Sequence, residues 1–140
     1  MRALVDANVF LSFLLHPRRE TAASELVRAA LAGRFQLLVP EGLLEEIEVI
    51  APTKPYLADR IPSASLRALF DLLRAEGEMV PPLTRPIPPV TRDRKDDYLI
   101  AHAIAGAADV LVSGDQDLLT LGRIDTLQIL SPKDFLAMLG

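Results

Sequence analysis

Short apolar runs alternate along the chain with longer stretches in which apolar residues recur every three or four positions. The first pattern is typical of buried β-strands, and the second is typical of amphipathic helices. The sequence therefore predicts strands at residues 3–6, 36–39, 78–80, 109–113 and 127–130. It predicts helices at residues 8–15, 20–31, 41–51, 56–61, 63–75 and 96–105, a helical turn after residue 117 and a last helix from residue 132.

Strands that alternate with helices in this way form a mostly parallel sheet with helices on both faces. We therefore expect an α/β fold, a three-layer α/β/α sandwich around a twisted, mostly parallel sheet of four or five strands. No repeat or second domain is visible, so residues 1–140 are expected to form a single domain. Residues 81–95 contain five prolines and predict a long ordered loop, a length at which loops are often functional.

Composition narrows the classes of function. The chain has no cysteine, which excludes disulfides, thiolate zinc sites and a cysteine nucleophile. No apolar stretch approaches the roughly 20 residues that span a bilayer, so we expect a cytoplasmic protein with no membrane contact. The formal net charge of −4 ordinarily argues against nucleic acid as a partner, but that argument weakens if several of the acids bind cations.

Carboxylates gather where the predicted strands end. Asp6 follows the apolar run at residues 3–5, and Asp115 and Asp117 follow the run at residues 110–112. The ligand crevice of an open α/β sheet lies at the carboxyl ends of its strands. Neighbouring carboxylates repel one another, so their gathering indicates a bound cation. Mg²⁺ and Mn²⁺ are the candidates because they take oxygen ligands.

Each of these side chains also has a purely structural interpretation. Asp6 and Asn8 are suited to capping the helix that follows them, and Asp117 is suited to capping a short turn. Asp115 can serve a Gly-Asp turn, and the glutamates at residues 45–48 can simply face solvent. The joint placement of the acids at strand ends favours the cation.

Helical phase distinguishes the two adjacent aspartates at the start of the helix at residues 96–105. Asp96 projects close to the centre of the predicted buried stripe, whereas Asp97 lies roughly 90° away from it. An acid directed at the core needs a partner or a metal ion. We therefore expect Asp96 to be a ligand and Asp97 to be the helix cap or a supporting acid. The predicted stripe consists of Leu99, Ile100, Ala103, Ile104 and Ala107.

The same reasoning applies to the helix at residues 41–51. Its predicted apolar stripe has Glu46 at one edge, whereas Glu45 lies on roughly the opposite side. Glu46 is therefore the glutamate expected to reach the site.

Other catalytic classes fit less well. His102 lies about two turns along its helix from Asp96 and is given no catalytic role. No Ser-His-Asp arrangement, P-loop or glycine-rich dinucleotide motif is present. A phosphatase of the haloacid-dehalogenase type requires a second aspartate where Asn8 stands, and a receiver domain requires an acid pair where Asp6 stands alone.

The chain resembles the PIN-domain family, in the branch of VapC-like ribonuclease toxins from toxin–antitoxin pairs. The resemblance covers almost the whole chain and rests on residues 4–9, Glu46, residues 93–99 and residues 107–119, with Ser131-Pro132 before the last helix. It implies metal-dependent hydrolysis of RNA. The catalytic residues that it implies are Asp6, Glu46, Asp96 and Asp115, and the metal ligands are Asp6, Asp96 and Asp115 with Asp117 beside them.

The resemblance also implies supporting roles. Asn8 would orient Asp6, and Ser113 stands where the family usually carries Ser or Thr. The basic residues Arg92, Arg94 and Lys95 flank the site and either contact the RNA backbone or are simply solvated.

Three partners follow as expectations. RNA is the implied substrate, and a nearby-encoded antitoxin would insert a basic side chain, most naturally arginine, among the carboxylates. A homodimer is expected because Phe10, Phe13 and Leu14 give one early helix apolar surface for association. The alternative to an enzyme is a non-catalytic PIN module that binds RNA or a protein.

Overall fold

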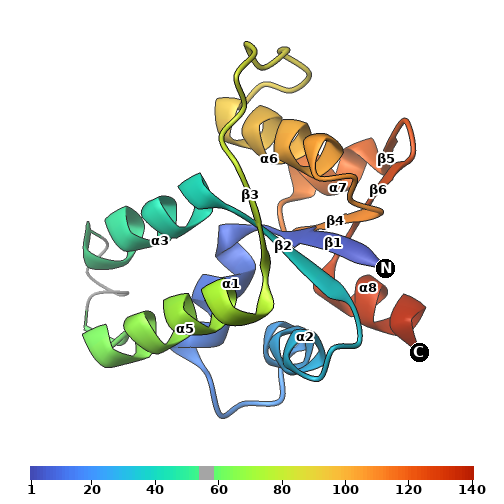
Figure 1. Ribbon diagram of the computed structural model, residues 1–140. Coiled ribbons are helices and arrows are strands. Elements are labelled where there is room, and N and C mark those ends of the chain that lie inside the picture. The colour runs from blue at the N-terminus through green and yellow to red at the C-terminus, as the bar shows by residue number, and fades with distance from the viewer. Residues whose placement is uncertain (54–58) are drawn as a thin grey trace.

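Six strands form the central sheet of the computed structural model, which describes residues 1–53 and 59–140 (Figure 1). Their order across the sheet is β3-β2-β1-β4-β6-β5, and every pair is parallel except β5 with β6. The strands are β1 (Arg2–Val5), β2 (Gln36–Pro40), β3 (Glu78–Val80), β4 (Val110–Val112), β5 (Arg123–Ile124) and β6 (Leu127–Leu130). The expected mostly parallel sheet is confirmed, with one strand more than expected.

The additional strand is β5, which has two residues and pairs antiparallel with β6. Gly122 and Asp125 adopt positive φ angles of 69° and 53° on either side of it. These two positive-φ residues fold the chain back on itself, and no apolar run in the sequence predicts such a short hairpin.

Helices cover both faces of the sheet, which confirms the three-layer architecture. Figure 1 shows α6 and α7 on one side, with α1, α2, α5 and α8 on the other. The helices are α1 (Ala7–Leu15), α2 (Ala22–Leu31), α3 (Glu41–Thr53), α5 (Ser63–Glu76), α6 (Arg94–Ala105), α7 (Gln116–Leu121) and α8 (Pro132–Leu139). The helical piece expected at residues 56–61 lies largely outside the described residues.

The core is mainly aliphatic, because the central strands are apolar on both faces. Leu4, Val5 and Leu111 have no exposed surface. Parallel pairing aligns Val5 with Val112, so β1 and β4 end at the same edge of the sheet. None of the described helices is long and apolar enough to cross a lipid bilayer.

Two details of α6 differ from expectation. The helix begins at Arg94 and is capped by Asp93, whose side chain accepts a hydrogen bond from Lys95 N at 2.9 Å, so neither of the predicted aspartates is the cap. The predicted buried stripe is also wrong at its far end. Ile104 is 50% exposed, whereas His102 is buried beneath the ring of Tyr98, with 3.9 Å between ring centroids.

The apolar surface proposed for a homodimer is not available on α1. Phe10 is 1% exposed and Leu14 is 4% exposed, because α1 packs against α2 and α3. Only Phe13 of the three is partly exposed. The burial of Phe10 and Leu14 removes the argument that pointed to a dimer through this helix.

Candidate metal centre

Asp6 lies directly after β1 and is held by two neighbours. It caps α1 by accepting a hydrogen bond from Asn8 N at 3.4 Å, and its Oδ2 accepts one from Ser113 Oγ at 2.8 Å. Ser113 directly follows β4, is fully buried, and accepts a hydrogen bond from Asp115 N at 3.0 Å through the same hydroxyl oxygen. One serine therefore ties the ends of both strands together and orients Asp6.

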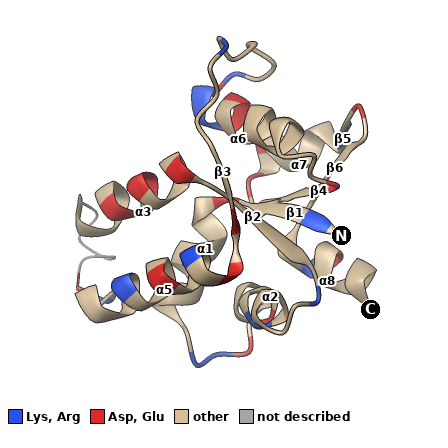
Figure 2. Cartoon of the chain, in the orientation of Figure 1, with Lys and Arg blue, Asp and Glu red and all other residues tan. Residues whose placement is uncertain are grey.

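A pocket of about 280 Å³ opens at this edge of the sheet. Asp6 and Asp115 approach it from the strand ends, Glu46 from α3, and Asp96 from the first turn of α6. Asp93, the cap of α6, also lines it. The remaining lining residues are Asn8, Lys95 and three apolar side chains, Leu11, Ile50 and Leu99. Figure 2 shows acidic positions on α3 and at the start of α6, on either side of this edge.

The two acids that helical phase favoured, Glu46 and Asp96, are the ones that line the pocket. Glu46 is half-buried and lines it, whereas Glu45 is exposed and does not. Asp96 is 5% exposed and lines the pocket, whereas Asp97, which is also buried, does not line it.

Several negatively charged side chains lie close together in the pocket. Burial, followed by the charges of Asp115, Asp93 and Asp6, raises the pKa of Asp96 to about 6. Burial also raises the pKa of Asp6, although the hydrogen bond from Ser113 opposes it. Burial and the charge of Asp6 raise the pKa of Glu46. Lys95 is the one cationic side chain among the described residues that line the pocket, against five acidic side chains, so negative charge is in excess.

Asp97 is buried for a different reason. Its Oδ1 accepts hydrogen bonds from Val90 N at 3.0 Å, Thr91 N at 2.7 Å and Thr91 Oγ1 at 2.8 Å. Burial alone would raise the pKa of Asp97, but the bonds from Thr91 and Val90 lower it overall. Asp97 therefore anchors the end of the proline-rich loop to α6.

Asp117 and Asn8 relate to the pocket in different ways. Asp117 is exposed and is absent from the lining, and its backbone N–H donates to Asp115 Oδ1 at 3.0 Å. Asp115, and not Asp117, is thus the cap of α7. Asn8 lines the pocket, but the bond it gives Asp6 comes from its backbone N–H and not from its side chain. Ser113 is the side chain that orients Asp6.

Comparison with known proteins decides the family. The family model described as PIN domain matches residues 2–117. The chain belongs to the PIN-domain family. A search of curated proteins with the sequence found no match.

Among solved structures, this PIN domain is similar to a chain in the crystal structure of VapBC2 from Rickettsia felis bound to a DNA fragment from their promoter. The TM-score is 0.59 at 13% sequence identity, and the alignment covers 94% of this chain and 98% of that chain. At this identity the likeness concerns the fold. Family membership also sets aside the phosphatase and receiver-domain interpretations of Asp6.

The donor set of the PIN-domain pocket fits a hard divalent cation in its chemistry, because its candidate ligands are all carboxylate oxygens. Burial, with a smaller contribution from neighbouring acids, raises the pKa values of Asp6, Glu46 and Asp96, so their charged forms lack stabilisation. Across the described part of the chain, however, no three acidic or histidine side chains already lie close enough together to hold a metal ion. A cation held by three or more of these carboxylates would therefore require their side chains to move from the positions seen here.

α3 and α6 also meet in one close contact. Gly42 lies one turn before Glu46, and a Cβ atom added to it would overlap the hydroxyl of Tyr98, two residues after Asp96. Glycine at this position leaves room for the Tyr98 hydroxyl without displacing it. Sequence reasoning missed both residues, because the pairing joins distant segments and leaves no local pattern.

Proposed function

We propose that this PIN domain is a Mg²⁺- or Mn²⁺-dependent endoribonuclease that acts as the toxin of a toxin–antitoxin pair. The observation that carries this proposal is the convergence of four acids from four segments on one pocket at the carboxyl edge of the sheet: Asp6, Glu46, Asp96 and Asp115. Family membership and the fold shared with a chain of a VapBC2 complex support it.

The four acids would hold the cation. A bound Mg²⁺ or Mn²⁺ ion supplies Lewis-acid activation of water and charge neutralisation at a phosphodiester. The protein's own contribution is to hold the ligands in place: Ser113 fixes Asp6 by donating to its Oδ2, and the backbone N–H of Asp117 fixes Asp115 by donating to its Oδ1. No serine, threonine, cysteine or histidine is among the described residues that line the pocket, so water is the nucleophile.

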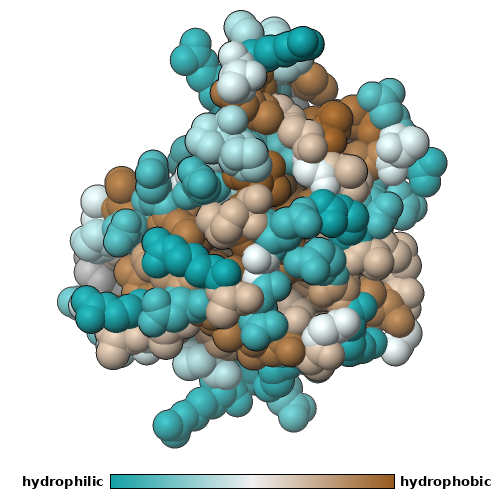
Figure 3. All heavy atoms as spheres, viewed as in Figure 1, coloured by the Kyte–Doolittle hydropathy of each residue, from teal (hydrophilic) through white to brown (hydrophobic). Residues whose placement is uncertain are grey.

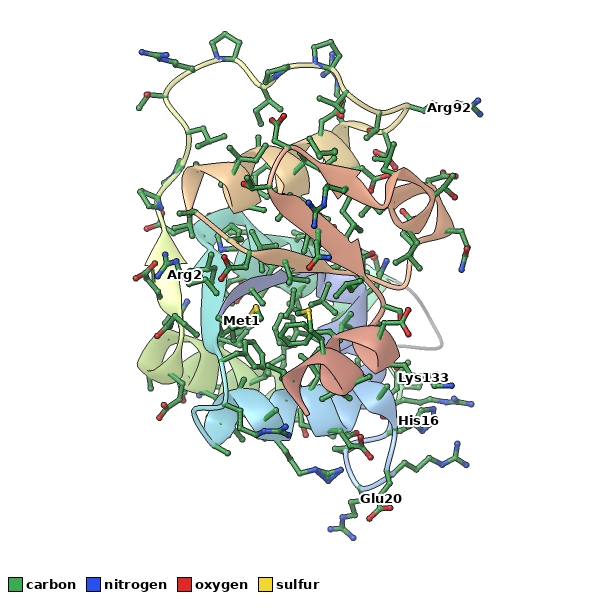
Figure 4. All side chains as sticks on the ribbon, turned by 90° about the vertical axis from the view of Figure 1, so that its right-hand side faces the viewer. Met1, Arg2, His16, Glu20, Arg92 and Lys133 are labelled. Atoms are coloured by element: carbon green, nitrogen blue, oxygen red, sulfur yellow. The ribbon has the colours of Figure 1, made fainter. Side chains whose placement is uncertain are left out.

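The basic residues next to the site differ in their placement. Lys95 lines the pocket and is placed to meet the phosphate that is cut. Arg94 lines a separate cavity together with Arg85 and other residues of the loop. Arg92 extends from the loop into solvent (Figure 4). Of the three, Lys95 is the residue we assign to the scissile phosphate.

The surplus of carboxylates also fits a protein inhibitor. An antitoxin that inserts an arginine would relieve the same repulsion as a cation, because a guanidinium pairs bidentately with a carboxylate. We place the protein in the cytoplasm, where RNA and such an inhibitor are available. A homodimer remains part of the proposal but has to form through a surface other than the buried face of α1.

Cleavage of RNA by the purified protein tests the enzyme. We expect cleavage with Mn²⁺ or Mg²⁺ and none with EDTA. Glu46→Gln should abolish cleavage, whereas Glu45→Gln, the matched change one residue away on the exposed face, should leave it nearly unchanged. Cleavage that persists in EDTA would refute the metal mechanism.

Two further results separate the alternatives. Binding of RNA without cleavage under any of these conditions would favour the non-catalytic module. Induced expression in a bacterial host tests the toxin role, because an active ribonuclease without its antitoxin should arrest growth. Normal growth with an active protein present in the cells would argue against a toxin.

A further inference from the structure

A second cavity, of about 540 Å³, adjoins the acidic pocket. Asp96 lines both cavities, so it forms a wall common to the two. We call the second cavity the side pocket. Its other lining residues come from the end of the proline-rich loop and from α7: Val90, Thr91, Arg92, Asp117, Thr120 and Leu121. A linear polymer that binds with one of its units at the acidic pocket therefore has the neighbouring unit beside the side pocket.

Two apolar side chains are exposed at the side pocket. Val90 is 50% exposed and Leu121 is 39% exposed. Figure 3 shows hydrophobic residues reaching the surface among the loop residues and over α6. Such surface is available to contact the face of a flat, apolar group. The hydrogen bonds from Val90 N and Thr91 N to Asp97 hold the loop side in place without a ligand.

On the α7 side, two polar side chains lie on the same helix face as Leu121. Asp117, Thr120 and Leu121 are spaced at i, i+3 and i+4, so they share one face of the helix. The Thr120 hydroxyl donates to Gln116 O at 2.7 Å, which leaves its oxygen as an acceptor. The Asp117 carboxylate offers two acceptor oxygens and is exposed.

This lining is better suited to a nucleobase than to a phosphate. Asp96 and Asp117 would repel an anion inside the side pocket, and the one cationic side chain in its described lining, Arg92, extends outward from the loop (Figure 4). A base is neutral, presents a flat face to apolar side chains, and carries N–H donors on its edge. Arg92, at the rim of the side pocket, is available to contact the RNA backbone.

We propose that the side pocket holds a guanine base next to the phosphate that is cut, with Asp117 as the residue that selects it. Guanine fits best because its N1–H and N2–H donors lie side by side and match the two oxygens of one carboxylate. Adenine and cytosine place an acceptor beside their amino group, and uracil has a single N–H between two carbonyls. This inference rests on the proposed ribonuclease function, and it gives Asp117 a role outside the metal centre.

Binding of labelled hexanucleotides tests the selection. The protein carries Asp6→Asn, so that it binds without cutting, and the RNAs are oligouridylates with a single central G, A, C or U. We expect the G-containing RNA to bind about tenfold more tightly than the others, the usual worth of a bidentate base contact. Asp117→Asn replaces one acceptor with a donor, so the preference for G should fall to about twofold or less.

Two controls isolate the side pocket. Leu121→Ser should weaken binding of all four RNAs alike by several-fold, whereas Leu31→Ser, a similarly exposed leucine on α2, should not change it. Titration of Mn²⁺ into the Asp117→Asn protein, with Asp6 intact, should give the affinity of the unmodified protein.

The outcomes are distinct. A loss of Mn²⁺ affinity in Asp117→Asn would make this residue a metal ligand and overturn the proposal, as would equal binding of the four RNAs. If Asp117→Asn removes a preference for G, but the unmodified protein with Asp6 intact cuts no RNA with Mn²⁺, the side pocket would be supported and the ribonuclease rejected.

Discussion

Replacing Asp96 with asparagine should stabilise the metal-free protein at neutral pH. The change is nearly isosteric and removes one charge from the pocket. In the folded protein, burial and then the charges of Asp115, Asp93 and Asp6 raise the pKa of Asp96 from 3.8 to about 6. A carboxyl whose folded pKa is raised opposes folding once it ionises, so the penalty is absent below about pH 4 and complete above about pH 6.

The size of the effect follows from the pKa. A rise of about two in pKa corresponds to about 3 kcal/mol at pH 7.5. The pocket is open to solvent, which screens the charges, so about 1–2 kcal/mol is the expected gain for Asp96→Asn. With excess Mn²⁺ the order should reverse, because the unmodified protein gains the free energy of binding and the variant gains less.

Urea unfolding in EDTA at pH 7.5 and at pH 4 measures this directly. The adjacent Asp97→Asn is the control, and its expected sign at pH 7.5 is opposite, because hydrogen bonds lower the pKa of Asp97 and its charge supports the loop. Destabilisation by Asp96→Asn at pH 7.5 without metal, or a gain of equal size at both pH values, would refute the electrostatic account of the pocket.

Two further changes test how the site is held. Ser113→Ala removes the donor to Asp6, so the pKa of Asp6 should rise further, and Mn²⁺ affinity measured by calorimetry should fall by about tenfold, with recovery in Ser113→Thr. Gly42→Ala should lower the melting temperature by forcing Tyr98 aside, and adding Tyr98→Phe should restore part of the loss because the overlapping hydroxyl is gone; no recovery in the double variant would mean that the strain lies elsewhere.

The strands were predictable because each buried strand is a short, nearly continuous apolar run. Leu4 and Val5 on β1 are apolar and fully buried, as are all three residues of β4. A strand that is buried on both faces of a sheet explains such a continuous apolar run. β5 was not predictable, because its two residues, Arg123 and Ile124, contain no pattern and the hairpin depends on the backbone angles of Gly122 and Asp125.

The far end of α6 shows where periodicity fails. Ile104 was expected to be buried on phase alone, yet it is half exposed, and His102 occupies buried space instead. The Nδ1 atom of His102 lies 2.8 Å from Tyr98 O, and its ring packs on that of Tyr98. A polar side chain that is hydrogen-bonded to a partner one turn away can be buried as readily as an apolar one. The periodicity of apolar residues alone does not reveal that partner.

The same physics separates Asp96 from Asp97. A buried carboxylate needs a partner, and the sequence correctly indicated which acid points into the pocket, because direction on a helix follows from position. It did not indicate that Asp97 would be buried too, because the partners of Asp97 are backbone N–H groups and a hydroxyl at the end of the loop at residues 81–93. The result is two neighbouring acids with pKa values displaced in opposite directions. Asp97 is satisfied by the protein itself, whereas Asp96 still lacks a counter-charge, and that difference makes Asp96 the better candidate to meet a cation or an inhibitor's arginine.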